Sequence, residues 1–442
     1  MISKLQFLSK KFDDIKLKLL SFFAFILPIV TIIKGKHGII IWMVITSVFI
    51  TMVITTSLIK RSRILLTGFE KIYLLTNILY VFWGIFIIWY HDNQLIELSG
   101  LLPFVYASYF FIGLKFLDYK VWDKIMCGIY ISAAFLLFYI VLWIDQGSFG
   151  SRWLSRWTSN LHYPISFGNI CALFALFCIN DLLNKSSYAL KILGIISISI
   201  FLGGIILSET RISIIAVIVV TIYIVLSNHR KFSSLKLKYI GLIIGLLIII
   251  FTAIFSKDLI SRYKLGISHI NQYFIENNVK SNDGSRLESY RVGWIFFSQN
   301  PIFGTGIERR GWYNTDNEIR YDDMIQELHK KGETKFTKNY YQMPHNQLLY
   351  NAVQMGFLGF ILVFMMIIFL PAIIFYRAYN SRVVNKEISV LNIFYLCTLI
   401  FAMTDIPFLF PYETLFFMSI IPPLLLCDAN FFRHKTSIVS ST

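Results

Sequence analysis

The chain has 442 residues, of which 56% are hydrophobic and 15% are charged. A soluble domain carries about 25% charged residues, so this composition excludes an ordinary soluble protein and predicts a membrane protein surrounded by lipid. The formal net charge is +16, but the basic residues form short clusters between apolar runs, which is typical of cytoplasmic membrane loops and argues against nucleic acid as a partner.

About twelve stretches qualify as membrane spans, because a span needs about 20 predominantly apolar residues. The expected spans are 17–33, 38–59, 72–90, 96–114, 123–144, 163–182, 190–208, 211–227, 239–255, 347–376, 388–404 and 410–428. In lipid the backbone must satisfy its own hydrogen bonds, so these stretches are expected to be helices. The fold class predicted is therefore an all-α integral membrane protein.

The orientation follows from the Lys and Arg residues of the short connections, which concentrate in alternate connections. By the positive-inside rule these connections and both termini lie in the cytoplasm. We expect residues 1–255 to hold the first nine spans and residues 346–442 to hold the last three and a cytoplasmic tail. Residues 256–345 then form a large loop outside, which carries 13 basic and 11 acidic residues.

The large loop is expected to contain amphipathic helices. In residues 285–298, SRLESYRVGWIFFS, apolar side chains recur at helical spacing, which predicts a helix lying on the bundle or on the membrane surface. These side chains are Leu287, Tyr290, Trp294 and Phe297. Pro301 lies just beyond the helix, and Gly304 and Gly306 in PIFGTG allow a tight turn.

Two ionisable residues stand beside expected spans. Arg211 separates two apolar runs in LSETRISIIAV, where a polar group suggests function, although it can instead snorkel or pair with Glu209. His345 precedes the span that begins near Gln347. A histidine accepts a proton near neutral pH, as activation of a hydroxyl requires, while a lone interfacial histidine is more often only hydrogen-bonded. Its neighbour Asn346 strengthens the functional interpretation.

Three further residues are weaker candidates. Arg286 and Arg291 lie in the loop helix, and a guanidinium matches the oxygens of a phosphate. From composition alone, both are more simply interpreted as solvated arginines. Asp405, in FAMTDIPF, follows an apolar run and either orients a histidine or arginine or caps the next segment.

Several enzyme signatures are absent from the sequence. We find no P-loop, no HExxH zinc pair, no GxSxG elbow and no Asp-x-Asp pair in the loop. The five cysteines lie in or beside apolar runs, so neither a disulfide framework nor a zinc site is expected. An outward-facing enzyme lacks nucleotide donors, so an activated lipid is the expected energy source, with no cofactor and no metal.

Three motifs, in this order, resemble the O-antigen ligase and polymerase superfamily of bacterial envelopes. They are SETRIS at 208–213, GSRLESYRVGWIFFSQNPIFGTGI at 284–307 and PHNQLLYNAVQMGFLGF at 344–360. Their order and their placement around one loop carry the resemblance. It covers the carboxyl-terminal half, whereas the amino-terminal half matches by its number of spans. The first motif departs from the family in having TRIS where many members have a form like SRGA.

The resemblance implies a metal-independent glycosyltransferase of the bacterial inner membrane, with its active face and the loop on the periplasmic side. As an O-antigen ligase, it would move polysaccharide from undecaprenyl pyrophosphate to lipid A-core. Arg211 and Arg286 would bind the pyrophosphate, and His345 would position or deprotonate the acceptor hydroxyl. The other expected substrate-binding residues are Arg291, Asn346 and Asp405.

Other functions fit parts of this pattern. An O-antigen polymerase, which joins lipid-linked repeat units, would have the same motifs, and a related enzyme glycosylates protein serines or threonines. A flippase for lipid-linked oligosaccharides would also be basic with about twelve spans. It would be expected to have repeats and broken helices near the midplane, and the sequence contains no clear repeat.

Overall fold

The computed structural model describes residues 2–59, 64, 66–93, 95–117, 121–144, 164–184, 187–208, 210–228, 245, 256–276, 278–279, 281–307, 324–336, 344–381, 386–408 and 413–425. Within these ranges every regular element is a helix and there is no strand. The expected span 239–255 lies almost entirely outside the described residues.

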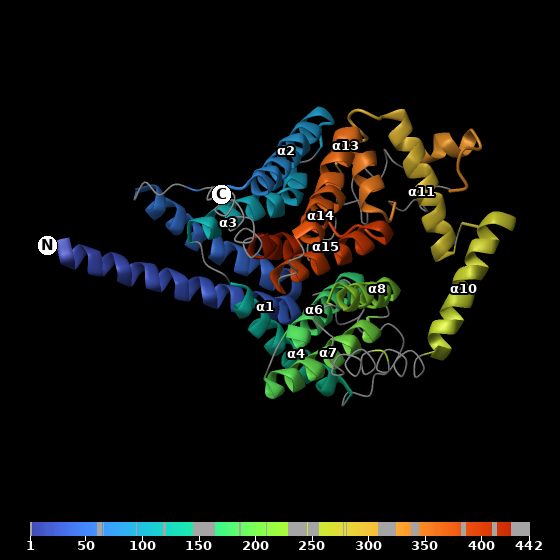
Figure 1. Ribbon diagram of the computed structural model, residues 1–442. Helices are drawn as coiled ribbons and strands as arrows, with labels where there is room; N and C mark the ends of the chain where they lie inside the picture. The colour runs from blue at the N-terminus through green and yellow to red at the C-terminus, as the bar shows by residue number, and fades with distance from the viewer. Residues whose placement is uncertain are drawn as a thin grey trace.

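The helices follow one another without a sheet (Figure 1). They are α1 (Ile2–Ile59), α2 (Gly68–Tyr90), η1 (Leu95–Gly100), α3 (Leu102–Leu117), α4 (Trp122–Ile144), α6 (Pro164–Asn184), α7 (Tyr188–Leu207), α8 (Arg211–Asn228), α10 (Ser256–Ile275), α11 (Asn282–Gln299), α13 (Gln347–Phe364), η3 (Met365–Phe369), α14 (Leu370–Ser381) and α15 (Lys386–Thr404). Residues 324–330 and 413–425 are also helical.

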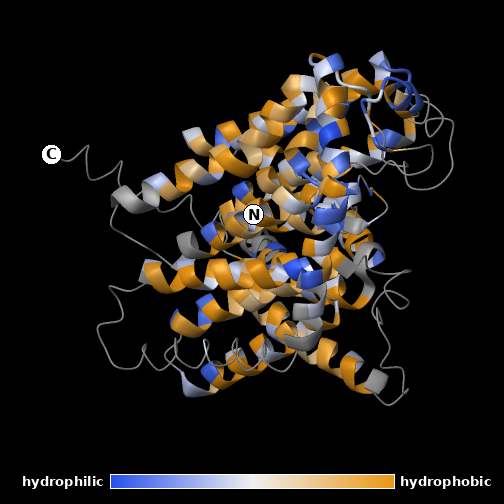
Figure 2. Ribbon diagram, turned by 90° about the vertical axis from the view of Figure 1, so that its right-hand side faces the viewer, coloured by the Kyte–Doolittle hydropathy of each residue, from blue (hydrophilic) through white to orange (hydrophobic). Residues whose placement is uncertain are grey.

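Seven helical stretches in the described part are long and apolar enough to cross a membrane, and four shorter apolar helices accompany them. Together they coincide with eleven of the twelve expected spans. The helical membrane architecture is therefore confirmed, while the total of twelve spans stays a prediction. Most of the ribbon carries hydrophobic residues (Figure 2). Outward-facing side chains such as Phe82 and Trp89, 68% and 75% exposed, are suited to contact with lipid.

The first two expected spans are the two halves of α1, and they lie antiparallel. Lys16 Nζ donates a hydrogen bond of 2.7 Å to Thr56 Oγ1, and Trp42 Nε1 donates one of 2.8 Å to Phe23 O. An unbroken helix would separate residues 16 and 56 by about 60 Å. The helix therefore folds back on itself.

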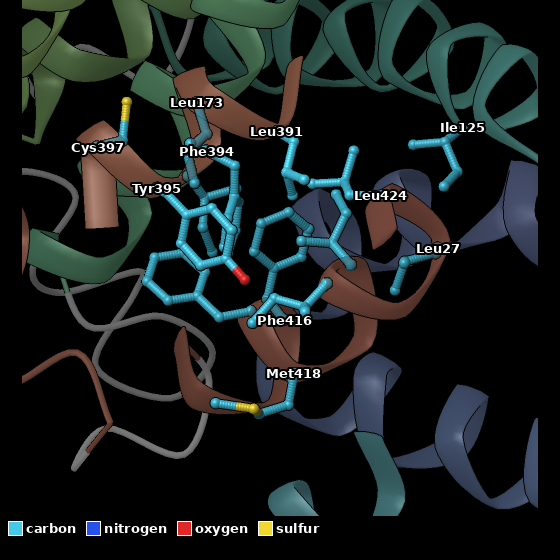
Figure 3. Packing of buried hydrophobic residues seen from close by; sticks show 14 of the residues in the cluster. Leu27, Ile125, Leu173, Leu391, Phe394, Tyr395, Cys397, Phe416, Met418 and Leu424 are labelled. Carbon is cyan, nitrogen blue, oxygen red and sulfur yellow. The ribbon is translucent and has the colours of Figure 1, made fainter. Parts of the chain in front are cut away.

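α6 lies at the centre of the bundle. Every side chain from Ser166 to Leu182 is buried, as expected for a helix that is apolar on all sides and covered by others. Its neighbours include α7, α8 and α15. Figure 3 shows Leu173 of α6 near Phe394 of α15 and Phe416 of the last described helix. The central core therefore joins helices from both halves of the chain.

α11 packs on α13 and contributes to a second apolar cluster, and α10 and α11 lie to one side of the bundle (Figure 1). The helix predicted over 285–298 is confirmed as α11, but its apolar stripe is not the packed face. Trp294 is 61% exposed, whereas the polar Glu288 is fully buried beside Val292 and Phe296. The face of α11 that carries Glu288 can be buried because hydrogen-bond donors surround the Glu288 carboxylate.

α13 is broken at Gly356, whose φ of 65° and ψ of −163° are not helical. The PIFGTG turn fills the break with its own backbone. Its hydrogen bonds are Thr305 N to Val353 O at 2.7 Å, Gly306 N to Gln354 O at 3.1 Å, and Phe357 N to Pro301 O at 2.7 Å. In addition, Trp83 Nε1 of α2 donates to Met355 O at 2.8 Å. Irregular backbone inside a bundle is tolerated when protein groups satisfy it in this way.

Candidate functional site

His345 and Asp405 meet at the junction of α13 and α15. His345 stands two residues before α13 begins and Asp405 directly follows α15. The His345 Nδ1 atom lies 3.3 Å from Asp405 Oδ1, and both side chains are buried. Asp405 Oδ1 also accepts from Ile406 N at 2.9 Å, whereas Oδ2 is buried without a hydrogen-bond partner among the described residues. An unsatisfied buried carboxylate oxygen is costly, which points to a functional constraint.

Asn346 explains how His345 is held. It is the N-cap of α13, where its Oδ1 accepts from Leu349 N at 3.0 Å. Asparagine is a preferred residue at this position because its side chain satisfies a free amide of the first turn. Its Nδ2 donates to Met403 O at 3.3 Å, at the end of α15. The residue therefore has a structural role beside His345, and its contact with substrate stays a prediction.

Arg286 reaches the same site through α11. One turn after it, the Tyr290 hydroxyl donates to His345 O at 2.9 Å. Burial raises the pKa of Tyr290, the positive charge of Arg286 lowers it and the charge of Asp405 raises it. Both charged groups therefore influence this hydroxyl electrostatically. The structure brings together Tyr290, His345 and Asp405, and α11 places Arg286 one turn before Tyr290.

Arg211 is the exposed first residue of α8 and faces the beginning of α11. A Cβ atom at Gly266 of α10 would lie 3.7 Å from Arg211 Nη1 and 3.5 Å from Asp283 Oδ2. Asp283 also accepts from His269 Nδ1 at 3.1 Å, and lies three residues before Arg286. Arg211 thus approaches the turn of α11 that carries Arg286. The alternative partner Glu209 lies outside the described residues.

Arg291 has a different environment. Its Nη2 and Nε donate to the two oxygens of Glu288 at 2.7 and 3.1 Å. Glu288 also accepts from Tyr273 OH at 2.8 Å, Thr334 Oγ1 at 2.7 Å and Lys335 N at 2.7 Å. Burial alone would raise the pKa of Glu288, but these donors lower it to about 2. The geometry favours a structural role for Arg291, and its substrate role stays a prediction.

A groove of about 610 Å³ opens beside this site, within the size range of small-molecule binding sites. Its lining residues are Tyr290, Trp294, Phe297, Asn346, Leu348, Leu349, Ala352, Phe357, Phe360 and Met403. Most of them are apolar. Two lining side chains are polar. Tyr290 donates to the backbone of His345, and Asn346 follows His345 in the chain. The apolar stripe of α11 thus lines a groove with one polar end.

Sequence reasoning missed two features. Tyr290 was treated only as an apolar member of the helical stripe, although its spacing from Arg286 puts both on one face of α11. Asn169 was overlooked inside an expected span. Its Nδ2 donates to Glu413 Oε1 at 2.8 Å and its Oδ1 accepts from Ser213 Oγ at 2.8 Å. A polar residue within an apolar run was the available signal.

Comparisons with known proteins concern the segments that carry the three motifs. A family model described as O-Antigen ligase matches residues 196–364, a range that contains all three motifs and both arginines of the pyrophosphate prediction. The resemblance to the O-antigen ligase and polymerase superfamily is thereby confirmed. An uncharacterized protein of Haemophilus influenzae is 30% identical over 252 residues, which are 55% of this chain and 59% of that relative. The chain thus spans less than two thirds of the relative's length.

Proposed function

We propose that this protein is an O-antigen ligase, which transfers polysaccharide from undecaprenyl pyrophosphate to lipid A-core. The observation that carries the proposal is the buried His345 and Asp405 pair, which adjoins the end of an apolar groove lined by Tyr290 and Asn346. The family match over residues 196–364 supports a membrane glycosyltransferase that uses lipid-linked glycan. The proposal places the site at the periplasmic face of the inner membrane, with both termini in the cytoplasm.

His345 acts as the base in this proposal. With Nδ1 protonated and donating to Asp405, the Nε2 lone pair is free to accept the proton of an acceptor hydroxyl. The carboxylate also stabilises the imidazolium that forms. Tyr290 holds the backbone of His345, so the ring is fixed before substrate arrives.

Arg286 and Arg211 bind the pyrophosphate of the donor. Both lie toward the beginning of α11, where the helix dipole adds positive potential. Guanidinium groups match phosphate oxygens and stabilise the negative charge that grows on the leaving group. The groove between α11 and α13 accepts part of the isoprenoid chain, because its walls are apolar.

The transfer step balances without a metal or a cofactor. The acceptor oxygen attacks the anomeric carbon of the first sugar of the donor, and a new glycosidic bond forms. The bond between that carbon and the pyrophosphate oxygen breaks, and undecaprenyl pyrophosphate leaves with the electron pair. The hydroxyl proton passes to His345.

The break in α13 is a feature that a transporter would also have. In transporters such breaks line a substrate cavity near the midplane. Here the backbone groups around Gly356 bond to the 301–306 turn and to Trp83. The break therefore has an internal structural explanation, which favours the enzyme.

A gel of envelope glycolipid from a strain that lacks this gene tests the proposal. Loss of polysaccharide on lipid A-core, with accumulation of polymerised glycan on undecaprenyl pyrophosphate, is expected for the ligase. Core that carries only one repeat unit would identify an O-antigen polymerase instead. Loss of glycan from the core with accumulation of unpolymerised lipid-linked units would favour a flippase. An unchanged pattern would overturn both functions and favour protein glycosylation.

A further inference from the structure

Three buried polar side chains connect helices from distant parts of the chain. Asn169 of α6 donates to Glu413 Oε1 at 2.8 Å and accepts from Ser213 Oγ of α8 at 2.8 Å. All three side chains have no exposed surface. Polar groups inside an apolar bundle are costly to bury. Their position therefore calls for an explanation in terms of the site.

At one end, this network contacts the first turn of the helix that carries Arg211. Ser213 lies in the first turn of α8, two residues after Arg211. A Cβ atom at Gly168 of α6 would lie 2.5 Å from Ser208 Oγ and 2.7 Å from Thr210 Oγ1. The residues on either side of Arg211 are thus held against α6. Arg211 itself is left exposed.

At the other end, the network reaches the segment that carries Asp405. Glu413 begins the last described helix, and the next residue, Thr414, donates to Pro407 O at 3.0 Å. Through Thr414, the helix that Glu413 begins is therefore tied to the segment directly after Asp405. Because Asp405 contacts His345, we expect a change at Glu413 to displace the partner of the proposed base.

We propose that Asn169 is a positioning residue, which holds Arg211 and the His345 and Asp405 pair in one register through its two hydrogen bonds. The inference rests on the proposed function. An amide is suited to this position because it donates to a carboxylate and accepts from a hydroxyl at the same time. An aspartate lacks the donor, and a leucine lacks both groups. The competing explanation is that the network only holds the helices together.

Exchange of the amide at position 169 and the carboxylate at position 413 tests the proposal. In Asn169→Asp, two carboxylates face each other, and we expect kcat for glycan transfer to fall about tenfold or more. In the double variant Asn169→Asp with Glu413→Gln, the new amide at position 413 donates to the new carboxylate at position 169. Ser213 still donates to its other oxygen. We expect kcat of the double variant to return to within about twofold of the wild-type value.

Matched serines separate positioning from stability. Ser213→Ala removes one hydrogen bond of the network and should lower kcat. Ser419→Ala removes a buried hydroxyl from the helix that Glu413 begins, but that hydroxyl donates to Leu415 O of the same helix at 2.7 Å. We expect Ser419→Ala to keep its kcat. If both variants lose thermal stability to the same extent and neither changes kcat, Asn169 has no positioning role.

A measurement of the distance between α8 and α13 tests the proposal without relying on glycan transfer. Spin labels at Ile215 of α8 and Leu358 of α13, which are exposed, report the register in a variant without the five cysteines. We expect the distance distribution to shift or broaden in Asn169→Asp and to recover in the double variant. An unchanged distribution, or no recovery, overturns the proposal. If the unchanged protein transfers no glycan, the proposed function fails, and the label distances still decide the role of Asn169.

Discussion

The carbonyl oxygen of Ile302 lies 2.0 Å from the position that a Cβ atom at Gly356 would occupy. The two residues belong to different motifs, and the turn of the first fits into the helix break of the second. Gly304 is similarly placed, since its Cβ would lie 2.5 Å from the backbone carbon of Gln354. The motifs at 284–307 and 344–360 therefore form one structural unit.

Gly356→Ala is expected to displace the turn and to destabilise the protein by several kcal/mol, because strained φ alone costs on the order of 1–3 kcal/mol and the backbone clash adds to it. The measurement is the thermal unfolding midpoint of the purified protein. Gly203→Ala is the control, since nothing lies within 4 Å of its Cβ position. Equal midpoints for the two variants would show that the turn is not anchored there.

Asp405→Asn should lower kcat for transfer by about a hundredfold or more, because an amide can donate to Nδ1 and thereby stabilise the wrong tautomer of His345. His345→Ala provides the inactive reference. Transfer is measured with purified protein and lipid-linked glycan. Full activity of Asp405→Asn would rule out the carboxylate as the group that orients the base.

Arg286→Lys should reduce donor turnover about tenfold, because an ammonium group cannot reproduce the two parallel hydrogen bonds of a guanidinium to phosphate. Arg291→Lys is the matched control on the same helix. It keeps the positive charge beside Glu288 and is expected to keep its turnover. The assignment fails if the two variants lose activity equally.

The stability of the loop around Glu288 should fall at acidic pH. Its pKa in the folded protein is about 2 against an ordinary value of 4.5. Because the pKa of Glu288 is depressed in the folded protein, its stabilisation is complete above about pH 4.5. It is lost as the pH falls toward 2. The shift corresponds to on the order of 3 kcal/mol. Thermal unfolding measured from pH 6 to pH 3 should show the larger part of this loss, and Glu288→Gln should show a smaller pH dependence.

Transfer should continue in the presence of a chelator, because Arg211 and Arg286 supply the positive charge for the pyrophosphate. The rate is measured with and without EDTA on protein purified in detergent. Strong inhibition that is reversed by added Mg²⁺ would overturn the metal-independent reaction.

The sequence by itself determined the class of the protein and the positions of most helices. A run of about 20 apolar residues has only one stable form in lipid, so composition and run length predict the spans directly. The loop helix at 285–298 and the turn with Gly304 follow from local preferences in the same way. The motifs identified Arg211, Arg286 and His345 as candidates without any contact information.

Only the tertiary structure decided which candidates meet. His345 and Asp405 are 60 residues apart, and no local pattern shows that their helices end side by side. Arg286 and Arg291 look alike in the sequence, but Arg286 stands one turn before Tyr290, which contacts His345. Arg291 instead pairs with the buried Glu288. The role of Asn169 is equally hidden, because its partners lie on two distant helices. Such contacts depend on how helices pack, which short-range sequence patterns do not encode.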